Sequence, residues 1–522
     1  MGLTAREGGK GRVGTGNGLG GCVWMGSAQR EDVSLTCVVK VQAAQLRVPL
    51  LRYESECVEA PDGCWDMARA STRFYQSAPP LVSWCIMDLA RTPENVLRVL
   101  KARIVDTARA KGLQTCTDPG VRSVADTSQN GIARGFLSVL TESEQRGQRI
   151  QLVLVIKPAD GHDSVYRSIK RVSDSMYGVI TQVMDAKHLQ TDNIDAHYIL
   201  NIVIQMNSKL GGLNYVLERT DLVPFDESAM LVGATLMTAE DGRELLLKRR
   251  DQLDPYGSAV AASGAAASSS GTSSSLCNVA ALTATYDHTL MRYHAVAHLQ
   301  DAAGDTRILS FERLFEKALE YYRACNGHAP RIVVVFRDGL LTDAIEESSR
   351  DQIFAYEREA LLSACAKLMP EYKPQLVYIA VQKRDDAVLF HTKSARLRAG
   401  IVVHGLSTAS ARRGWHLLSR AGSNLGASRP CRYEVFADEA PTTDAQLQQM
   451  CFNLCFTWAR STCAVAVVAP VMYATSLAER MFVLTSRYPA SIENEAPSHE
   501  HDAEGAWTER IHPLLDGTLF FI

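Results

Sequence analysis

Long hydrophobic runs are missing from this chain of 522 residues. The best apolar stretch, Cys463 to Ala474, is interrupted by Pro470 and is shorter than the roughly 18 residues that a membrane-spanning helix needs. The beginning of the chain also lacks a charged segment followed by an apolar one, so we expect no secretory signal peptide. Met1-Gly2 resembles the start of a myristoylation motif, but Arg6 stands where that motif has Ser or Thr. We therefore expect no membrane partner.

Excess charge of either sign is missing too. The chain has 55 Lys and Arg against 58 Asp and Glu, a formal net charge of −3. Its 46% apolar and 22% charged residues are ordinary for a globular protein and exclude wholesale disorder. The length predicts about three or four domains of roughly 100–200 residues each, or fewer large ones. A local basic groove stays compatible with this total, because nucleic-acid binding depends on local charge.

A regular cysteine framework is the third absence. The 13 cysteines are scattered, which is typical of reduced thiols in an intracellular protein. Cys451 and Cys455 are four residues apart, but no His or Cys pair stands at zinc-finger spacing nearby. We interpret them as core residues and expect no zinc site.

Three stretches have a composition that cannot bury a core. We assign residues 1–44 to a glycine-rich disordered tail, although Val33 to Arg52 alternates enough to suggest strands. In residues 257–275, 17 of 19 residues are Gly, Ala or Ser, which predicts a mobile insert. Pro489 to Glu509 has six acidic residues and no Lys or Arg, which indicates a solvated loop. The Gly- and Arg-containing tail leaves two compartments open, the cytoplasm as the expectation and the mitochondrion as the alternative.

Between these stretches, strands and helices alternate. Leu152 to Ile156 is a compact apolar run and predicts a buried strand, followed by helical spacing from Tyr166 to Val179. From residue 229 the expected order is three strands, helix, strand, helix, strand. The ranges are Ala229 to Ala234, Asn278 to Thr285, Tyr293 to Gln300, Ser310 to Arg323, Arg331 to Phe336, Asp351 to Lys367 and Leu376 to Gln382. This order is that of an RNase H-like fold, and fold analogy alone does not define function.

An ordered series of short motifs resembles the Argonaute/PIWI family. The segments are Gly63, Trp65 and Trp84; Gln182, Asn207 to Gly212 (NSKLGG) and Asn214; Arg337 to Gly339 (RDG); Val381 to Arg384 (VQKR) and Phe390; Gly426 to Pro430 (GASRP) and Tyr433; and Pro470, Tyr473, Ala474, Ala478 and Arg480. The series extends from about residue 45 to the end. The resemblance implies an α/β protein with a Rossmann-like MID domain followed by an RNase H-like PIWI domain.

The resemblance also implies the domain limits. We expect a linker at 45–79, a MID domain at 80–222 and a PIWI domain at 223–522 with the insert 257–275. Because residues 1–44 are too few for the family's N-terminal and PAZ domains, we expect a PAZ-less form.

In this family the MID domain holds the 5′ phosphate of a small guide strand. The matching residues are Tyr166, Lys170, Gln182, Lys209 and Arg480. Tyr166 and Lys170 are four apart and share a helix face, so an aromatic ring could stack on the first base while a cation meets the phosphate.

One position of this pocket departs from the family. Gln205 stands where other members have a lysine. Some members without that lysine recruit a divalent cation held partly by the C-terminal carboxylate. We hypothesise that the carboxylate of Ile522 and a Mg²⁺ ion replace the missing charge.

A basic segment is predicted to follow the nucleic-acid backbone. Lys383 to Tyr433 holds ten Lys and Arg against Asp385 and Asp386, a local net charge of +8. Cations alternate there with aromatic residues, as in channels for sugar–phosphate backbones. The backbone contacts assigned from this segment and from the family blocks are Lys383, Arg384, Arg429 and Arg460.

Cleaving members of the family use an RNase H-type site in which carboxylates hold two Mg²⁺ ions. The matching positions here are Thr235, Asp305, Asp338 and Thr475. Two ligands have become hydroxyls, which do not offset the charge of adjacent cations. We therefore expect Asp338 and Asp305 to be remnants and the catalytic metal pair to be absent.

Together these observations predict a protein that binds a small guide RNA and pairs it with a target nucleic acid without cleavage. Its output would come from occupancy or from recruited effector proteins. Two alternatives stay open: an active guide-directed endonuclease with a rearranged metal site, and a protein-interaction scaffold that no longer binds nucleic acid.

Overall fold

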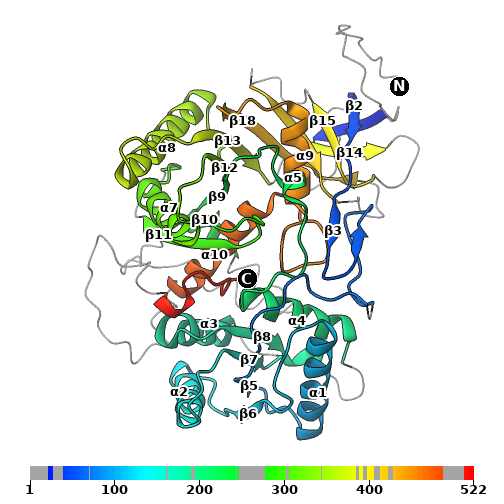
Figure 1. Ribbon diagram of the computed structural model, residues 1–522, viewed down its shortest axis with the longest axis vertical. Helices are drawn as coiled ribbons and strands as arrows, with labels where there is room; N and C mark the ends of the chain where they lie inside the picture. Colours follow the sequence, from blue (N-terminus) through cyan, green and yellow to red (C-terminus); the bar gives the residue numbers. More distant parts are fainter. Residues whose placement is uncertain are drawn as a thin grey trace, which may run out of the picture.

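The computed structural model describes fourteen stretches of the chain. These are residues 22–27, 39–69, 71–159, 163–189, 194–242, 244–245, 277–300, 305–342, 344–383, 387–391, 397–404, 412–420, 427–485 and 511–522. The predicted insert 257–275 and the acidic stretch 489–509 lie outside them. Figure 1 shows a smaller and a larger lobe, with the C-terminus between them. No helix in the described stretches is long and apolar enough to cross a membrane.

The small lobe is built on a four-stranded parallel sheet with the order β6-β5-β7-β8. Strands β5 and β7 are buried because they consist of consecutive apolar residues, as parallel strands covered on both faces do. Helix α1 packs against α4, and α2 packs against α3 (Figure 1). The elements are β5 Trp84–Asp88, α1 Glu94–Ala110, β6 Gly120–Ser123, α2 Gln129–Gln145, β7 Leu152–Lys157, α3 Asp163–Lys170, η1 Arg171–Tyr177, β8 Thr181–Asp185, η2 Ala186–His188 and α4 Ala196–Lys209. The predicted Rossmann-like arrangement is confirmed.

The helix expected from Tyr166 to Val179 is present in two pieces. Helix α3 passes directly into a π-helix, η1, which ends at Gly178 in the left-handed region with φ 60°. A side chain at Gly178 would also collide with the ring of His512. This glycine therefore lets the C-terminal segment pack against the small lobe.

The large lobe contains a twelve-stranded sheet whose first part runs β11-β10-β9-β12-β13. Strands β9, β10 and β11 are antiparallel neighbours, whereas β12 pairs in parallel with β9 and β13. The elements of this part are β9 Ala229–Met237, β10 Asn278–Thr285, β11 Tyr293–Gln300, α7 Phe311–Asn326, β12 Ile332–Asp338, α8 Glu347–Leu368 and β13 Gln375–Gln382. Each predicted strand and helix is present, so the RNase H-like order is confirmed.

Helix α10 (Ala469–Thr485) lies directly on β9 and β10 of this sheet. Gly233 on β9 makes the contact close, because a Cβ there would collide with the backbone carbonyl of Pro470. The hydroxyl of Thr283 on β10 donates a hydrogen bond to the same carbonyl at 3.0 Å. The start of α10 is therefore fixed over β9 and β10, which sets the position of Thr475 one turn further on.

The rest of the large sheet corrects the prediction of a disordered tail over residues 1–44. Strand β1 pairs with β2 and β14, and β2 pairs with β15, so both strands extend the sheet. The remaining elements are β1 Cys22–Ser27, β2 Val39–Gln45, β14 Ala387–His391, β15 Ile401–His404, β16 Gly414–Leu418, β17 Ala427–Ser428, β18 Cys431–Asp438, α9 Asp444–Leu454 and η4 Pro513–Leu515. Strand β2 lies within Val33 to Arg52, whose alternation suggested strands, whereas the glycine-rich composition concealed β1, because strand pairing is a long-range property that composition does not report.

Residues between β2 and the small lobe cross the junction of the two lobes. They include the hairpin of β3 Leu50–Arg52 and β4 Cys57–Glu59, and α5 Arg219–Leu222 lies nearby in the return connection. The ring of Trp65 packs against Tyr215 and Phe456, and its Nε1 donates to the hydroxyl of Tyr53 at 2.8 Å. This aromatic cluster ties the linker to both lobes.

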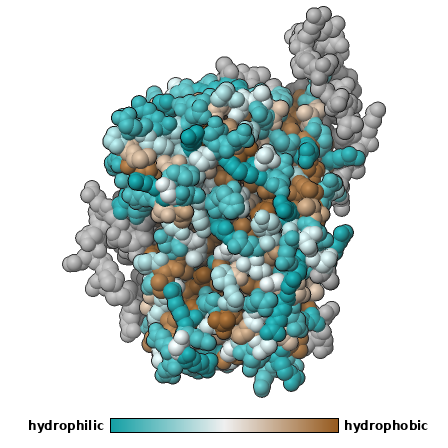
Figure 2. Space-filling view, in the orientation of Figure 1, coloured by the Kyte–Doolittle hydropathy of each residue, from teal (hydrophilic) through white to brown (hydrophobic). Residues whose placement is uncertain are grey.

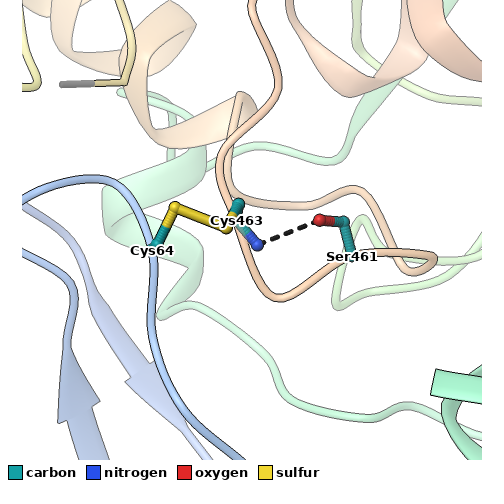
Figure 3. The surroundings of a disulfide bond; sticks show 3 residues. All are labelled: Cys64, Ser461 and Cys463. Carbon is teal, nitrogen blue, oxygen red and sulfur yellow. Dashed lines mark hydrogen bonds between the residues drawn. A yellow bond between two sulfur atoms is a disulfide. The ribbon is translucent and has the colours of Figure 1, made fainter. Parts of the chain in front are cut away.

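The expectation of uniformly reduced thiols is wrong at one position. Cys64 in the linker and Cys463 in the loop before α10 form a disulfide across 399 residues of sequence (Figure 3). The amide of Cys463 donates to the hydroxyl of Ser461 at 3.0 Å, and the Trp65 amide donates to the Thr462 carbonyl at 2.9 Å. Scattered spacing did not reveal the pair, since only folding brings the two segments together. Cys451 and Cys455 are buried in the core, as predicted.

Candidate nucleic-acid interface

Tyr166 and Lys170 share one face of α3, as their spacing predicted. The Nζ of Lys170 lies 5.8 Å from the centre of the Tyr166 ring. The same Nζ donates a hydrogen bond of 2.7 Å to the hydroxyl of Thr181, at the start of β8. Lys170 is buried and Tyr166 is half-buried.

Lys209, the last residue of α4, reaches the same point from the other side. Its Nζ donates to the Thr181 carbonyl at 3.0 Å and to Oε1 of Gln182 at 2.9 Å. The Nε2 of Gln182 in turn donates to Oε1 of Gln205 at 3.0 Å. The structure therefore joins the predicted residues through Thr181, which no motif had marked.

Arg480 on α10 brings the large lobe into this cluster. Its Nη1 donates to a carboxylate oxygen of Asp174 at 2.6 Å, and its Nη2 donates to the Tyr166 hydroxyl at 3.2 Å. The guanidinium also donates to the carbonyls of Phe520 and Phe521 at 3.1 and 3.3 Å. Small lobe, large lobe and C-terminal segment thus converge on one arginine.

The cluster contains more positive than negative charge away from water. Lys170, Lys209 and Arg480 are 1, 2 and 5% exposed, and the buried carboxylate beside them is Asp174. Burial and then the neighbouring Arg480 lower the pKa of Lys170 to about 8. Burial and then Lys170 lower the pKa of Lys209 well below its usual range. An anion entering the cluster would relieve both effects.

The C-terminal segment is docked beside these cations. Leu519, Phe520, Phe521 and Ile522 are buried against α10, as their apolar character suggested. The amide of His512 donates to the Asp174 carbonyl at 2.9 Å. Ile522, which carries the terminal carboxylate, is therefore fixed next to Phe520 and Phe521, whose carbonyls bind Arg480.

The residues offer a divalent ion only part of a coordination shell here. Asp174 is held by Arg480, which leaves the Ile522 carboxylate as the anionic group for such an ion. No cluster of three or more His, Cys, Asp and Glu side chains in the described stretches could hold a metal ion. Mg²⁺ would need phosphate oxygens from a ligand to complete its oxygen shell.

A second constellation lies at the end of β12. Asp338 ends this strand, and Thr235 on neighbouring β9 donates a hydrogen bond to Oδ2 of Asp338 at 3.2 Å. Lys383, directly after β13, places its Nζ 2.7 Å from the same oxygen. The Lys383 Nζ also donates to the hydroxyl of Thr475 on α10. Three of the predicted positions, Thr235, Asp338 and Thr475, therefore lie together. Lys383, which was predicted to contact the nucleic-acid backbone, connects Asp338 with Thr475.

Asp305 has a different set of contacts. Its carboxylate accepts hydrogen bonds from the Arg307 amide at 2.9 Å and from the Arg307 guanidinium at 2.7 Å. These contacts lower the pKa of Asp305, chiefly through the side-chain hydrogen bond of Arg307. These contacts of Asp305 therefore close a local turn before α7.

Glu357 on α8 is a buried acid near this site that motif matching missed. It pairs with Arg337, the residue before Asp338, at 3.1 Å, and accepts the Tyr378 hydroxyl at 2.6 Å. Arg337 also donates to the carbonyl of Thr306 at 2.8 Å. The carboxylate of Glu357 is therefore committed to the core beneath Asp338.

The donors around Asp338 do not suit a pair of divalent ions. One carboxylate is present and is already paired with an ammonium group, and the other two positions offer neutral hydroxyls. Two Mg²⁺ ions need several anionic oxygens in their shells.

The prediction of an unopposed basic segment is wrong in part. Arg412 pairs with Glu347, Asp351 and Glu434; Arg413 pairs with Asp438 and Asp444; and Arg432 pairs with Glu434. These acids come from α8, β18 and the start of α9, and all of them lie outside the segment Lys383 to Tyr433. Trp415 and His416 are buried, so they do not alternate with cations on a surface.

The other predicted backbone contacts have mixed positions. Arg429 and Arg460 are exposed, so both side chains are accessible from solvent. Lys383 is about one quarter exposed at its side chain. Arg384 lies outside the described residues.

A cavity of about 430 Å³ lies between the lobes beside the cation cluster. Gly178, Ile180, Lys209, Tyr293 and Leu519 are among its lining residues, whereas Tyr166 and Lys170 are not. Figure 2 shows scattered hydrophobic residues among a mostly hydrophilic surface on the face of the molecule that it draws. The cavity therefore borders the predicted phosphate pocket without coinciding with it.

Comparison with known proteins matches this architecture. The family model described as "Piwi domain" matches residues 152–485. The chain is 27% identical over 472 residues to "Protein argonaute PNH1" of Oryza sativa subsp. japonica, which covers 84% of this chain and 44% of that protein. The chain thus spans less than half the length of this curated relative.

Two solved structures share the fold. The crystal structure of Drosophila Piwi superposes with a TM-score of 0.71 at 18% identity, covering 93% of this chain and 57% of that one. Kluyveromyces polysporus Argonaute with a guide RNA superposes with a TM-score of 0.70 at 19% identity, covering 86% and 51%.

A Rossmann-like lobe joined to an RNase H-like lobe, with a cation cluster between them, defines the class of this protein. The family model matches more than half of the chain, and curated argonautes match most of it. The chain belongs to the Argonaute/PIWI family.

Proposed function

We propose that this protein holds the 5′-phosphorylated end of a small guide RNA and presents the guide for pairing with a target, without cutting the target. The observation that carries the proposal is a cluster of three buried cations, in which Lys170 and Lys209 bind Thr181 and Arg480 is paired with the buried carboxylate of Asp174. A terminal phosphate dianion is the ligand whose charge best compensates such a cluster.

The half-buried ring of Tyr166 supports an end-binding mode. Its hydroxyl is held by Arg480 and its ring lies beside Lys170, so the ring has a fixed plane next to the cations. A first base could stack on this plane while its phosphate meets the lysines. Specificity would then lie in base pairing of the rest of the strand.

The relatives support the nucleic-acid class of the ligand. The Kluyveromyces polysporus protein was solved with a guide RNA, and the fold of this chain follows that structure. Target pairing, effector partners and a cytoplasmic location belong to the same proposal.

The Mg²⁺ hypothesis is part of this proposal as well. Gln205 adds no charge, and its amide oxygen is taken by Gln182. We propose that Ile522 lends its carboxylate to a Mg²⁺ ion whose remaining ligands are guide phosphate oxygens and water. The protein would hold the ion only when a guide is bound.

The absence of cutting is supported by donor chemistry. Thr235 and Thr475 offer hydroxyls where anionic oxygens are needed, and Asp338 is paired with Lys383. The protein would regulate its target through occupancy or a recruited partner.

The test is binding of a short RNA with a 5′ phosphate, compared with the same RNA ending in a 5′ hydroxyl, by fluorescence anisotropy. We expect the phosphate to improve affinity about ten- to a hundredfold, the range of charge-assisted hydrogen bonds. Lys170→Ala should remove most of this difference, whereas Lys187→Ala, an exposed lysine of the same lobe, should leave it intact. Equal affinity for both RNAs would reject the proposal.

A second assay addresses cutting. A guide-loaded protein incubated with a paired, end-labelled target and Mg²⁺ or Mn²⁺ should leave the target whole. Guide-directed fragments that disappear in Asp338→Ala would overturn the non-cleaving part while leaving guide binding intact.

A further inference from the structure

The cluster at the end of β12 contains its own cation. Lys383 Nζ lies 2.7 Å from Oδ2 of Asp338 and donates to the hydroxyl of Thr475. Thr235 donates to the same carboxylate oxygen at 3.2 Å. Two hydroxyl side chains, from β9 and α10, thus flank one ammonium–carboxylate pair.

The geometry leaves the ammonium group able to bind a further ligand. A lysine ammonium has three N–H donors, and the contacts to Asp338 and Thr475 account for two of them. The Lys383 side chain is 25% exposed, and that of Asp338 is 16% exposed. The third donor can therefore reach a group that arrives from solvent.

The local charge decides the class of that ligand. Asp338 and Lys383 together are neutral, and beneath them Arg337 and Glu357 form a second neutral pair. Thr235 and Thr475 carry no charge. Among the described residues around this pair, a divalent ion would meet no net negative charge, whereas an anionic oxygen could accept the remaining N–H of Lys383.

We propose that Lys383 is a resident cation that binds one phosphodiester group of the target strand in place of metal ions. Asp338 and the hydroxyl of Thr475 are positioning groups, which hold the ammonium at the rim of the sheet. The inference rests on the proposed pairing of a guide with a target. If it holds, binding of the target phosphate by Lys383 does not depend on divalent ions.

The experiment begins by loading the guide and measuring its affinity for each variant, so that a failure of guide binding is seen separately. Target affinity of the loaded protein is then measured with a series of targets, each carrying one neutral methylphosphonate in place of a phosphate. In the unmodified protein, one methylphosphonate position near the middle of the duplex should weaken binding about three- to tenfold.

Lys383→Met is the matching protein variant. It should weaken binding of the unmodified target by a similar factor, and the sensitive methylphosphonate should then cause no further loss. Lys383→Arg should restore most of the affinity, because it keeps the cation. Lys367→Met, at an exposed position near the end of α8, should behave as the unmodified protein. The inference would be overturned if the methylphosphonate reduced target affinity equally in the Lys383→Met variant and in the unmodified protein while both bound the guide normally.

Divalent ions provide the second readout. At constant ionic strength, exchanging Mg²⁺ for EDTA after the guide is loaded should leave the effect of the sensitive methylphosphonate unchanged. Asp338→Asn should retain or increase target affinity, because it removes a negative charge near the phosphate. Two results together would reject the resident cation: target affinity falls when Mg²⁺ is removed, and Asp338→Asn causes the same loss of target affinity. That combination would show a metal ion bound at this point.

Discussion

Arg480 on α10 and Asp174 in the π-helix η1 form a buried ion pair of 2.6 Å that joins the two lobes at the guide pocket. The arginine is 5% exposed and the aspartate 1%. The same arginine holds the C-terminal segment through two backbone carbonyls. This ion pair therefore contributes both to the stability of the lobe junction and to the charge in the pocket.

Asp174→Asn should destabilise the empty protein by about 3–5 kcal/mol, because it leaves Arg480 buried without its counter-charge. The variant pocket gains one positive charge, so a 5′-phosphorylated guide should raise the midpoint of thermal unfolding more than it does in the unmodified protein. Thermal unfolding with and without guide measures both effects. Ser143→Ala, a buried small-lobe hydroxyl away from the pocket, is the control. A guide-induced rise no larger than that of the unmodified protein would contradict the charge argument.

Guide affinity should fall as pH rises above about 8. Burial and then Arg480 lower the pKa of Lys170 to about 8 in the free protein, and a bound phosphate dianion raises it again. Binding therefore takes up protons above this pH, and affinity falls by up to about tenfold per pH unit for each proton taken up.

The measurement is the affinity of the same RNA with a 5′ phosphate and with a 5′ hydroxyl between pH 7 and 9.5. The difference between the two should shrink with rising pH, while the hydroxyl form changes little. A constant difference over the whole range would show that Lys170 is charged throughout.

Much of the architecture was predictable because its signals are local. Apolar runs such as Leu152 to Ile156 fixed the buried strands, and the four-residue spacing of Tyr166 and Lys170 correctly placed both on one helix face. Motifs placed Thr235, Asp338 and Thr475 in one series, and the fold brings them together.

What could not be predicted depends on contacts between distant segments. The predicted basic segment ends at Tyr433, one residue before Glu434, which pairs with Arg412. Acids that α8 and α9 bring to Arg412 and Arg413 are distant in sequence, so the net charge of the segment does not include them. No motif marks Asp174, whose role depends on the turn of η1 and on Arg480, 306 residues away. The pairing of Lys383 with Asp338 likewise follows from the packing of β12 beside β13.

Gln205→Lys should increase affinity for a 5′-phosphorylated guide and remove the requirement for Mg²⁺. The new ammonium would lie beside Gln182 and Lys209, where the Gln205 side chain now accepts a hydrogen bond. It would supply the charge that we assign to the metal ion. Anisotropy in Mg²⁺ and in EDTA compares the variant with the unmodified protein, and Gln205→Glu is the matched control with the opposite charge. If EDTA leaves the affinity of the unmodified protein unchanged, Mg²⁺ has no part in this pocket.

Reduction of the Cys64–Cys463 disulfide should destabilise the junction between the linker and the loop before α10. The bond closes a loop of 399 residues, so breaking it restores chain entropy to the unfolded state, typically about 2–4 kcal/mol. The loop before α10 also carries the exposed Arg460. Ala459 in this loop contacts Tyr473 and Asn214.

Dithiothreitol should lower the midpoint of thermal unfolding of the unmodified protein and should not change that of the Cys64→Ser/Cys463→Ser variant. Cys57→Ser, which removes an exposed free thiol of the same linker, should respond to dithiothreitol as the unmodified protein does. Alkylation of the native protein before and after reduction, read by mass spectrometry, should show two additional modified cysteines only after reduction. Complete alkylation of Cys64 and Cys463 without reductant would show that the two thiols are not joined. The bond requires an oxidising environment to persist, so the same alkylation performed on freshly lysed cells also tests the proposed cytoplasmic location.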